Sequence, residues 1–353
     1  RNRPWPRHKM VDRDEVTMKQ NMRKWIHDIL CSDARRAFPL MMYTGIELTR
    51  VSIYDMLQSG KLQAECVTAL AERYPSAASI TAMDLSVEAE AFGSEVRCME
   101  TETPTITGSI VKNTESAASL TIPAIGSGRT GEFLEAAALV AATIADRPVF
   151  GCQIGPFSLA GRLCGMTEAL MNVHAEPEML HVVLQKSTTF LRDYARAFKQ
   201  TGVNGIVIAE PAAGLISPVH CDEFSSRYIK TIIDSVQDDD FMVILHNCGS
   251  VSRHVETMAS TGAMGMHFGN AVDMEQVLKA VPLGLLAFGN IDPVGVLKNG
   301  TEEEIHRATT NLLLKTSGYA NFILSSGCDV PPGTPLRNID AFFRALVEYN
   351  AAE

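Results

Sequence analysis

The chain has 353 residues, and its 31 Lys and Arg residues against 41 Asp and Glu residues give a formal net charge of −10. Hydrophobic residues make up 46% and charged residues 20%, a globular composition that excludes a disordered chain. The acidic balance argues against nonspecific binding to nucleic acid and to anionic membranes. No apolar run approaches the ~20 residues that span a bilayer, and the polar first residues lack the apolar core of a secretory signal. We therefore expect a cytoplasmic enzyme.

Eight cysteines are scattered along the chain. A long chain with no targeting signal and no dense cysteine spacing is not expected to form a disulfide framework. We expect free thiols, most of them small core residues and some of them metal ligands.

The first 35 residues are charged and helix-like, with one apolar stripe. The residues of this stripe are Val16, Met22, Trp25, Ile26 and Leu30. We expect residues 1–37 to form a helical extension that packs on a single larger domain, residues 38–353.

Beyond this extension, short apolar runs alternate with longer helical stretches. The predicted strands are Pro39–Tyr43, Ala78–Met83, Val149–Ile154, Gly205–Ala209, Phe241–Leu245, Ala263–Phe268, Leu283–Phe288 and Asn321–Leu324. The clearest helices are Glu176–Lys199, Ser225–Val236 and Glu302–Lys315. The strands are continuously apolar, as expected for parallel strands that are buried on both faces. Eight strand–helix units predict a (β/α)8 TIM barrel with additional N-terminal helices. An open doubly wound sheet is the alternative, and periodicity does not separate the two.

Reactive or polar side chains stand at the end of nearly every predicted strand. They are Glu47, Asp84, Gln153, Glu210, His246, Cys248, His267, Asn270, Asn290, Asp292 and Cys328. Active sites of parallel α/β folds lie at the carboxyl ends of the strands, so we expect these residues around one mouth. Turn formation alone would explain Asn290 and Asp292, but it explains a histidine and two cysteines poorly.

The sequence ILHNCGS predicts a metal site. His246 and Cys248 are two residues apart, so on an extended strand their side chains face the same way. Cys328 follows the last predicted strand, which lies across the mouth from the fifth strand in a closed barrel. One imidazole and two thiolates suit zinc, and three protein ligands leave a fourth position open. The alternative is a hydrogen-bonded core histidine with two inert cysteines.

Five stretches carry a family resemblance: VFGCQIGPFSLAGRLCG, GVNGIVIAEPAAGLISP, LHNCGS, LAFGNIDP and SSGCDVPPGTPLRNIDAF. From about Pro39 to the C-terminus, the chain resembles the uroporphyrinogen decarboxylase superfamily, and more narrowly its methylcobamide:coenzyme M methyltransferase branch. The resemblance implies a (β/α)8 barrel with extra N-terminal helices, in agreement with the strand count. It also implies a zinc ion held by His246, Cys248 and Cys328.

One segment after the first strand decides between the branches. Uroporphyrinogen decarboxylases resemble one another in an Arg-rich pattern there, R-Q-A-G-R, whose guanidinium groups suit a substrate with many carboxylates. Here the segment reads MMYTGIELTR and holds a single arginine, Arg50, with Glu47 beside it. The segment therefore argues against decarboxylation of uroporphyrinogen.

The resemblance implies zinc-dependent methyl transfer from a methylated corrinoid, such as methylcobalamin or a corrinoid protein, to a small thiol such as coenzyme M, in the one-carbon metabolism of an anaerobe. Zinc would hold the thiol as a nucleophilic thiolate. Glu210 matches an acidic residue of the family, and is expected as a fourth zinc ligand or as a residue that orients a ligand. A solvated turn carboxylate is the alternative. His267 is expected either to form a hydrogen bond in the pocket or to be a satisfied buried histidine.

Further residues are candidates for binding the substrate, and two segments are candidates for docking the partner protein. Those for substrate binding are Gln153, Asp84, Asn270 and Glu47, and those for a sulfonate group are Arg50, Arg162 and Arg337. The mouth should dock a corrinoid protein, with the segments GCQIGPFSLAG and CDVPPGTP shaping the opening.

Three other functions stay open at this point: methyl transfer from a methoxy or methylamine donor to a corrinoid protein, methyl transfer to tetrahydrofolate, and corrinoid or porphyrin binding without catalysis or metal.

Overall fold

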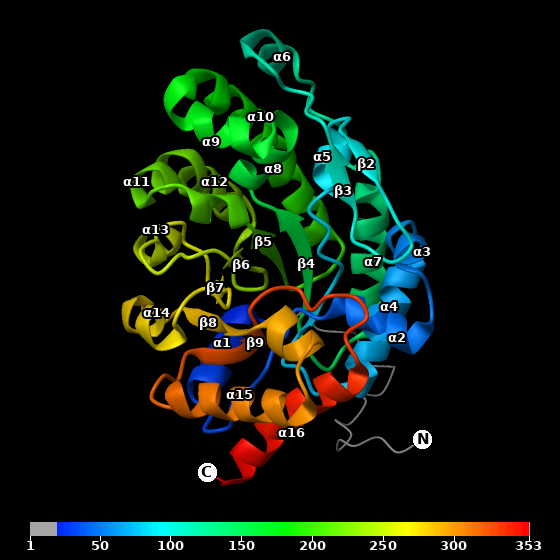
Figure 1. Cartoon of the computed structure of the whole chain (residues 1–353), viewed down its shortest axis with the longest axis vertical. Coiled ribbons are helices and arrows are strands. Elements are labelled where there is room, and N and C mark those ends of the chain that lie inside the picture. The colour runs from blue at the N-terminus through cyan, green and yellow to red at the C-terminus, as the bar shows by residue number, and fades with distance from the viewer. Residues whose placement is uncertain (1–19, 353) are drawn as a thin grey trace.

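The computed structural model describes residues 20–352, and its main sheet has seven parallel strands in the order β1-β4-β5-β6-β7-β8-β9. These strands are β1 (Ser79–Ile80), β4 (Val149–Ile154), β5 (Gly205–Ala209), β6 (Met242–Asn247), β7 (Gly265–Phe268), β8 (Leu286–Ile291) and β9 (Phe322–Ser326). A separate antiparallel pair consists of β2 (Glu95–Arg97) and β3 (Thr105–Thr107). Helices surround the curled main sheet (Figure 1).

The helices fall between the strands in the manner of a (β/α) barrel. They are α1 (Met22–Leu30), α2 (Ile46–Thr49), α3 (Ile53–Leu57), α4 (Gly60–Arg73), α5 (Val87–Ala91), α6 (Thr114–Ser119), α7 (Thr130–Thr143), α8 (Pro156–Cys164), α9 (Met166–Ala175), α10 (Pro177–Gln200), α11 (Pro218–Cys221), α12 (Arg227–Val236), α13 (Val255–Ala259), α14 (Met274–Ala280), α15 (Glu302–Lys315) and α16 (Leu336–Ala352). Short 3₁₀ or π segments are η1 (Met42–Gly45), η2 (Pro211–Leu215), η3 (Asp222–Ser226) and η4 (Pro293–Lys298).

Residues 36–38 join the two edge strands and close the barrel. The Phe38 N–H donates to the Leu324 carbonyl of β9 at 2.8 Å, and the Leu324 N–H donates to the carbonyl of Arg36 at 3.0 Å. On the other side, the Ala77 N–H donates to the Ala37 carbonyl at 2.7 Å, just before β1. The predicted TIM-barrel class is confirmed, and these bonds exclude the open doubly wound sheet.

Two of the predicted strands are wrongly placed. Pro39–Tyr43 is not a strand, because Pro39 has no N–H to donate to the ladder, and the chain turns into η1 directly afterwards. The strand predicted to begin at Leu283 begins three residues later, at Leu286. Leu283 is 74% exposed, since the Pro282 carbonyl accepts a hydrogen bond from the Leu285 N–H and closes a turn there.

The strand predicted at Ala78–Met83 is present but much shorter, because only Ser79–Ile80 pair with β4. The remaining predicted strands and helices are confirmed with small shifts at their ends. β4 and β5 have the predicted bounds, as does α15, while β6 and β9 each run two residues farther. All eight cysteines lie within the described residues and are free, as predicted. The division of the chain at residue 37 stays a prediction.

Helix α1 closes the amino end of the barrel. Its Met22 N–H donates to the carbonyl of Asp239, just before β6, at 2.6 Å. Of the predicted apolar stripe, Met22, Trp25 and Ile26 are buried, Leu30 is half-buried and Val16 lies outside the described residues. The Trp25 ring packs on Phe150 of β4, with 6.2 Å between the ring centroids. The helix therefore caps the apolar interior of the barrel.

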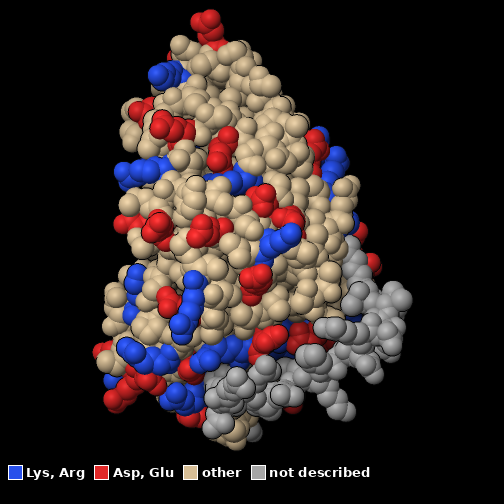
Figure 2. Space-filling view, turned by 90° about the vertical axis from the view of Figure 1, so that its right-hand side faces the viewer, with Lys and Arg blue, Asp and Glu red and all other residues tan. Residues whose placement is uncertain are grey.

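No helix within residues 20–352 is long and apolar enough to cross a membrane. On the described part of the face in Figure 2, Lys and Arg side chains are interspersed with Asp and Glu side chains, with no broad patch of one sign.

Trp25→Ala should lower the free energy of unfolding by about 3–5 kcal/mol, because it removes a buried indole and leaves a cavity at the base of the barrel. Urea denaturation followed by far-UV circular dichroism measures the loss. Lys24→Ala, on the exposed side of the same helix, should change stability by less than about 0.5 kcal/mol. Equal losses in the two variants would show that α1 is not part of the core.

Candidate metal centre

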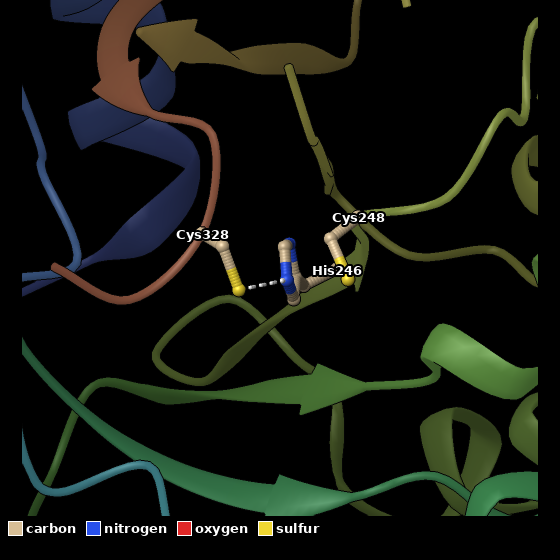
Figure 3. A group of neighbouring side chains, drawn as sticks. All are labelled: His246, Cys248 and Cys328. Carbon is tan, nitrogen blue, oxygen red and sulfur yellow. Dashed lines mark hydrogen bonds between the residues drawn. The ribbon is translucent and has the colours of Figure 1, made fainter. Parts of the chain in front are cut away.

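Three predicted ligands lie together at the carboxyl end of the barrel. His246 is buried within β6, Cys248 follows the same strand, and Cys328 follows β9. Their ligand atoms all lie within 4.8 Å of one another, and the Cys328 sulfur is 3.6 Å from His246 Nε2. In Figure 3, the two cysteines approach the His246 ring from opposite sides. Among residues 20–352, these three side chains form the one group of at least three His, Cys, Asp or Glu residues that could hold a metal ion.

Two glycines let the ligand-bearing loops pack closely. A Cβ atom at Gly269, after β7, would lie 2.5 Å from the Cα atom of Cys248. A Cβ atom at Gly327 would lie 2.6 Å from the backbone nitrogen of Asn270. Real Cβ atoms are not found at such distances from backbone atoms, so a side chain at either position would force the loops apart and separate the ligands.

A buried hydrogen-bonded chain fixes the orientation of His246. The Ser325 hydroxyl donates to the Phe38 carbonyl at 2.6 Å, so its oxygen can only accept from His267 Nε2, 2.9 Å away. Burial, followed by the charge of His246, holds the pKa of His267 well below its usual value, so this ring is neutral. His267 Nδ1 is then an acceptor for the Nδ1–H of His246, at 2.8 Å. His246 Nε2 is then the ring nitrogen that faces Cys328, whose sulfur is 3.6 Å away.

The two cysteines influence each other's ionisation. The Cys328 thiol and the His246 ring lower the pKa of Cys248 to about 4. The pKa of Cys328 is raised by its interaction with Cys248 and by burial, because a second negative sulfur would form beside the first. A divalent cation between them would remove this repulsion, so the donor set fits a zinc ion held by one nitrogen and two sulfurs, with one position left open.

Glu210 is buried directly after β5, and its carboxylate caps helix α8. The oxygens accept hydrogen bonds from the N–H groups of Phe157 at 3.0 Å and Ser158 at 2.6 Å, and from the Ser225 hydroxyl at 3.1 Å. Burial raises its pKa. The Asn247 amide donates to the Glu210 carbonyl at 2.7 Å. This bond ties the residue between His246 and Cys248 to the end of β5. The carboxylate is therefore engaged by α8 and is not a solvated turn residue.

The remaining predicted residues have diverse surroundings. Gln153 is 1% exposed in β4, and its amide has no hydrogen-bond partner among the described residues. Asp84 is buried and ion-paired with Arg129 at 2.5 Å. Asn270 is exposed beside Gly327, and Glu47 is exposed on α2.

Two predicted mouth residues, Asn290 and Asp292, and the segment GCQIGPFSLAG have local structural roles. Asn290 lies within β8, not after it, and its amide donates to the carbonyls of Gly269 and Val272. Asp292 caps η4 through the N–H groups of Val294 and Gly295, so both residues serve local structure. The segment GCQIGPFSLAG is not an opening loop, because it forms the buried end of β4 and the start of α8.

Sequence reasoning missed three residues near the predicted mouth: Ser325, Arg129 and Asp329. Ser325 carries no motif signal, since serine is common at strand ends. Arg129 lies far from the other residues in sequence. Asp329 is directly adjacent to Cys328 in the motif GCDVPP, and that adjacency was the one usable signal.

A sequence model of the uroporphyrinogen decarboxylase family matches residues 29–349. The chain belongs to this family. Within it, the chain is 29% identical over 270 residues to the methylcobamide:CoM methyltransferase MtbA of Methanosarcina acetivorans, covering 75% of this chain and 78% of the relative. It is 32% identical over 206 residues to the chloroplastic uroporphyrinogen decarboxylase 2 of Oryza sativa, covering 56% of this chain and 52% of the relative.

Solved structures show the same fold. A methyltransferase from Methanosarcina mazei superposes with a TM-score of 0.83 at 22% identity, over 93% of this chain and 99% of the other. This likeness covers the barrel of this uroporphyrinogen decarboxylase family member almost from end to end.

Ser325→Ala should weaken metal binding by about 10- to 100-fold, because it removes the acceptor that fixes the tautomer of His267 and hence of His246. Competition with a chromophoric chelator measures the affinity for Zn²⁺. The matched control is Ser326→Ala, which removes an equally buried hydroxyl that accepts from the Leu40 N–H at 3.0 Å and lies outside the chain to His246. If both variants bound zinc equally well, the hydrogen-bonded chain would have no role in orienting the ligand.

Proposed function

We propose that this protein is a zinc-dependent methyltransferase that moves a methyl group from a methylated corrinoid, carried by a partner protein, to a small thiol. The observation that carries the proposal is the convergence of His246, Cys248 and Cys328 at the carboxyl end of the barrel. The relatives named methylcobamide:CoM methyltransferase, which match three quarters of the chain, support the same reaction class.

The charges argue against the other activity found in this family. A substrate with many carboxylates needs several guanidinium groups. The segment that follows the barrel-closing residues holds one arginine, Arg50, and this side chain is exposed after α2. Among the described residues, Arg129 is the arginine that lies buried beside the mouth. Its guanidinium is already ion-paired with the carboxylates of Asp84 and Glu90.

The residues of the chain have defined tasks in this mechanism. Zinc, when bound, would deprotonate the acceptor thiol and keep it a thiolate. His246, Cys248 and Cys328 would hold the ion, and the two anionic sulfurs would balance its charge, so that the acceptor sulfur stays nucleophilic. His267 and Ser325 hold the His246 ring through its Nδ1 atom, which would leave Nε2 available to the ion.

In the transfer itself, the acceptor sulfur attacks the methyl carbon of the corrinoid in line. The new bond is S–C, the broken bond is Co–C, and the electron pair of the broken bond stays on cobalt, so Co(III) becomes Co(I). The protein needs only to position the two reactants and to exclude water, which can supply a large part of the rate enhancement.

Exposed apolar side chains after the strands support docking of the carrier protein at this end. Leu215 is 63% exposed and Val219 is 75% exposed, and both follow β5. Val294, which is 50% exposed, follows β8. The loop that holds Leu215 touches the metal-site loop, since a Cβ atom at Gly214 would lie 3.4 Å from the Cα atom of Gly249. A partner seated there would bring its corrinoid over the open coordination position.

Cys328→Ala should abolish both tight zinc binding and demethylation of free methylcobalamin, because it removes one of three ligands. Demethylation is followed optically as Co(III) is reduced, with a panel of thiols and with tetrahydrofolate as acceptors, and zinc is measured after a chelator wash. Cys31→Ser changes an exposed cysteine that directly follows α1, and this variant should retain both properties.

The outcomes of this experiment separate the remaining functions. Full activity of Cys328→Ala would eliminate the zinc mechanism. Transfer to tetrahydrofolate alone, or methylation of Co(I) corrinoid by a methoxy or methylamine donor, would keep the metal and change the substrate or the direction. Less than about half an equivalent of zinc in the wild-type protein, with no demethylation, would favour a tetrapyrrole-binding protein without catalysis.

A further inference from the structure

A small internal cavity lies between the carboxyl ends of β5 and β6 and the helices that follow these strands. Its polar lining residues are Glu210, Ser225, Ser226, Asn247 and His254, and apolar side chains of β6, α12 and α13 close the rest. The cavity has room for about one water molecule. Polar cavities of this size hold ordered water in proteins, whereas apolar ones stay dry.

His254 is a lining residue with an unmet hydrogen bond. The residue is 6% exposed, and its Nε2 lies 2.8 Å from the carbonyl oxygen of Ile216. A carbonyl oxygen can only accept, so Nε2 carries a proton and donates it, and Nδ1 of the neutral ring carries a lone pair. Nδ1 is buried and has no partner among the described residues. The ring therefore requires a hydrogen-bond donor at this nitrogen.

Two hydroxyl groups line the same cavity and can bond to the same donor. The Ser225 hydroxyl donates to Glu210 Oε2 at 3.1 Å, so its oxygen keeps lone pairs that can accept. The Ser226 hydroxyl lies 3.7 Å from the Cys221 sulfur, which is a weak partner. Buried waters typically make about three hydrogen bonds. A water that donates to His254 Nδ1 and bonds to both serines would make that number.

A metal ion or a larger molecule does not suit this cavity. Within the described residues, the His, Cys and Glu side chains around it do not bring three ligand atoms within 4.8 Å of one another. A molecule of several heavy atoms exceeds the room for about one water. A single water is the ligand that fits both the size and the hydrogen-bonding groups.

The cavity is lined by both of the loops that follow β5 and β6, and the second loop carries Cys248. The bond from His254 to the Ile216 carbonyl joins these two loops. The Asn247 amide joins them a second time, because it donates to the Glu210 carbonyl at 2.7 Å. The two bonds therefore hold the loop of the metal-ligand cysteine from both of its ends.

We propose that the cavity binds one water molecule, which donates to His254 Nδ1, and that the hydrated histidine positions the loop of Cys248 for metal binding. The water fixes the tautomer whose Nε2 donates to Ile216, because a donor at Nδ1 requires a lone pair there. The positioning role rests on the proposed function and deepens it, since it adds a residue that acts through Cys248. The water site itself rests on the cavity and on the unpartnered nitrogen.

A high-resolution crystal structure of the full-length protein tests the water site directly. We expect one ordered water about 2.7–3.2 Å from His254 Nδ1 and in hydrogen-bond contact with a serine hydroxyl of the cavity. His254→Phe keeps a ring in place and removes both nitrogens, so its structure should lack this water. A wild-type ring with no ordered water at Nδ1 would overturn the water site, and an unchanged water in His254→Phe would show that the histidine does not hold it.

Two further variants of His254 test the positioning of Cys248. Glutamine keeps a donor for the Ile216 carbonyl and alanine does not, so zinc affinity should fall by about 10- to 100-fold in His254→Ala and be largely restored in His254→Gln. Competition with a chromophoric chelator measures the affinity, and urea denaturation measures the stability of each metal-free protein. The control is Leu313→Ala, a buried residue of α15, which should lower stability and leave zinc affinity unchanged.

The outcomes distinguish this inference from the proposed function. Equal zinc affinity in the wild-type protein and His254→Ala would contradict the positioning role. A loss in Leu313→Ala as large as that in His254→Ala would also contradict it, because affinity would then follow stability. If the wild-type protein bound no zinc, the proposed function and the positioning role would both be wrong, and the crystal structure would still decide the water site. Tight zinc binding without demethylation of methylcobalamin would overturn the proposed function alone.

Discussion

One hydrogen-bonded chain couples closure of the barrel to the candidate metal centre. It begins at the carbonyl of Phe38, in the segment that joins the two edge strands, and passes through Ser325 of β9 and His267 of β7 to His246 of β6. The strands must therefore close the ring in this register before the imidazole can present a lone pair to an ion. The three ligands converge only if this closure holds, because Cys328 and His246 are 82 residues apart along the chain.

Much of the fold could be predicted from periodicity, because buried parallel strands leave a strong signal. The β4 and β5 strands are uninterrupted apolar runs between helices, and their ends were predicted correctly. The position of the first strand could not be read in the same way. Only three residues, 36–38, pair with their neighbours, and the apolar run that attracts attention begins after them, at a proline that cannot take part in the ladder.

The candidate ligands could be predicted because metal coordination uses few residue types at characteristic spacings. The groups that orient them could not. Ser325 and Arg129 gain their roles from tertiary contacts with Phe38 and Asp84, which no local pattern encodes. Glu210 shows the converse: its type and position attracted attention as a ligand, and in the structure its carboxylate is occupied by the first turn of α8. A carboxylate at a helix N-terminus gains both hydrogen bonds and a favourable dipole interaction.

X-ray absorption at the zinc K-edge tests most directly whether the three residues form a metal centre with an open position. For the zinc-loaded protein, the account predicts one nitrogen at about 2.0–2.1 Å and two sulfurs at about 2.3 Å, with a third sulfur added when a thiol acceptor is supplied. A coordination shell of nitrogen and oxygen alone, or a sulfur count that stays at two with saturating thiol, would contradict it.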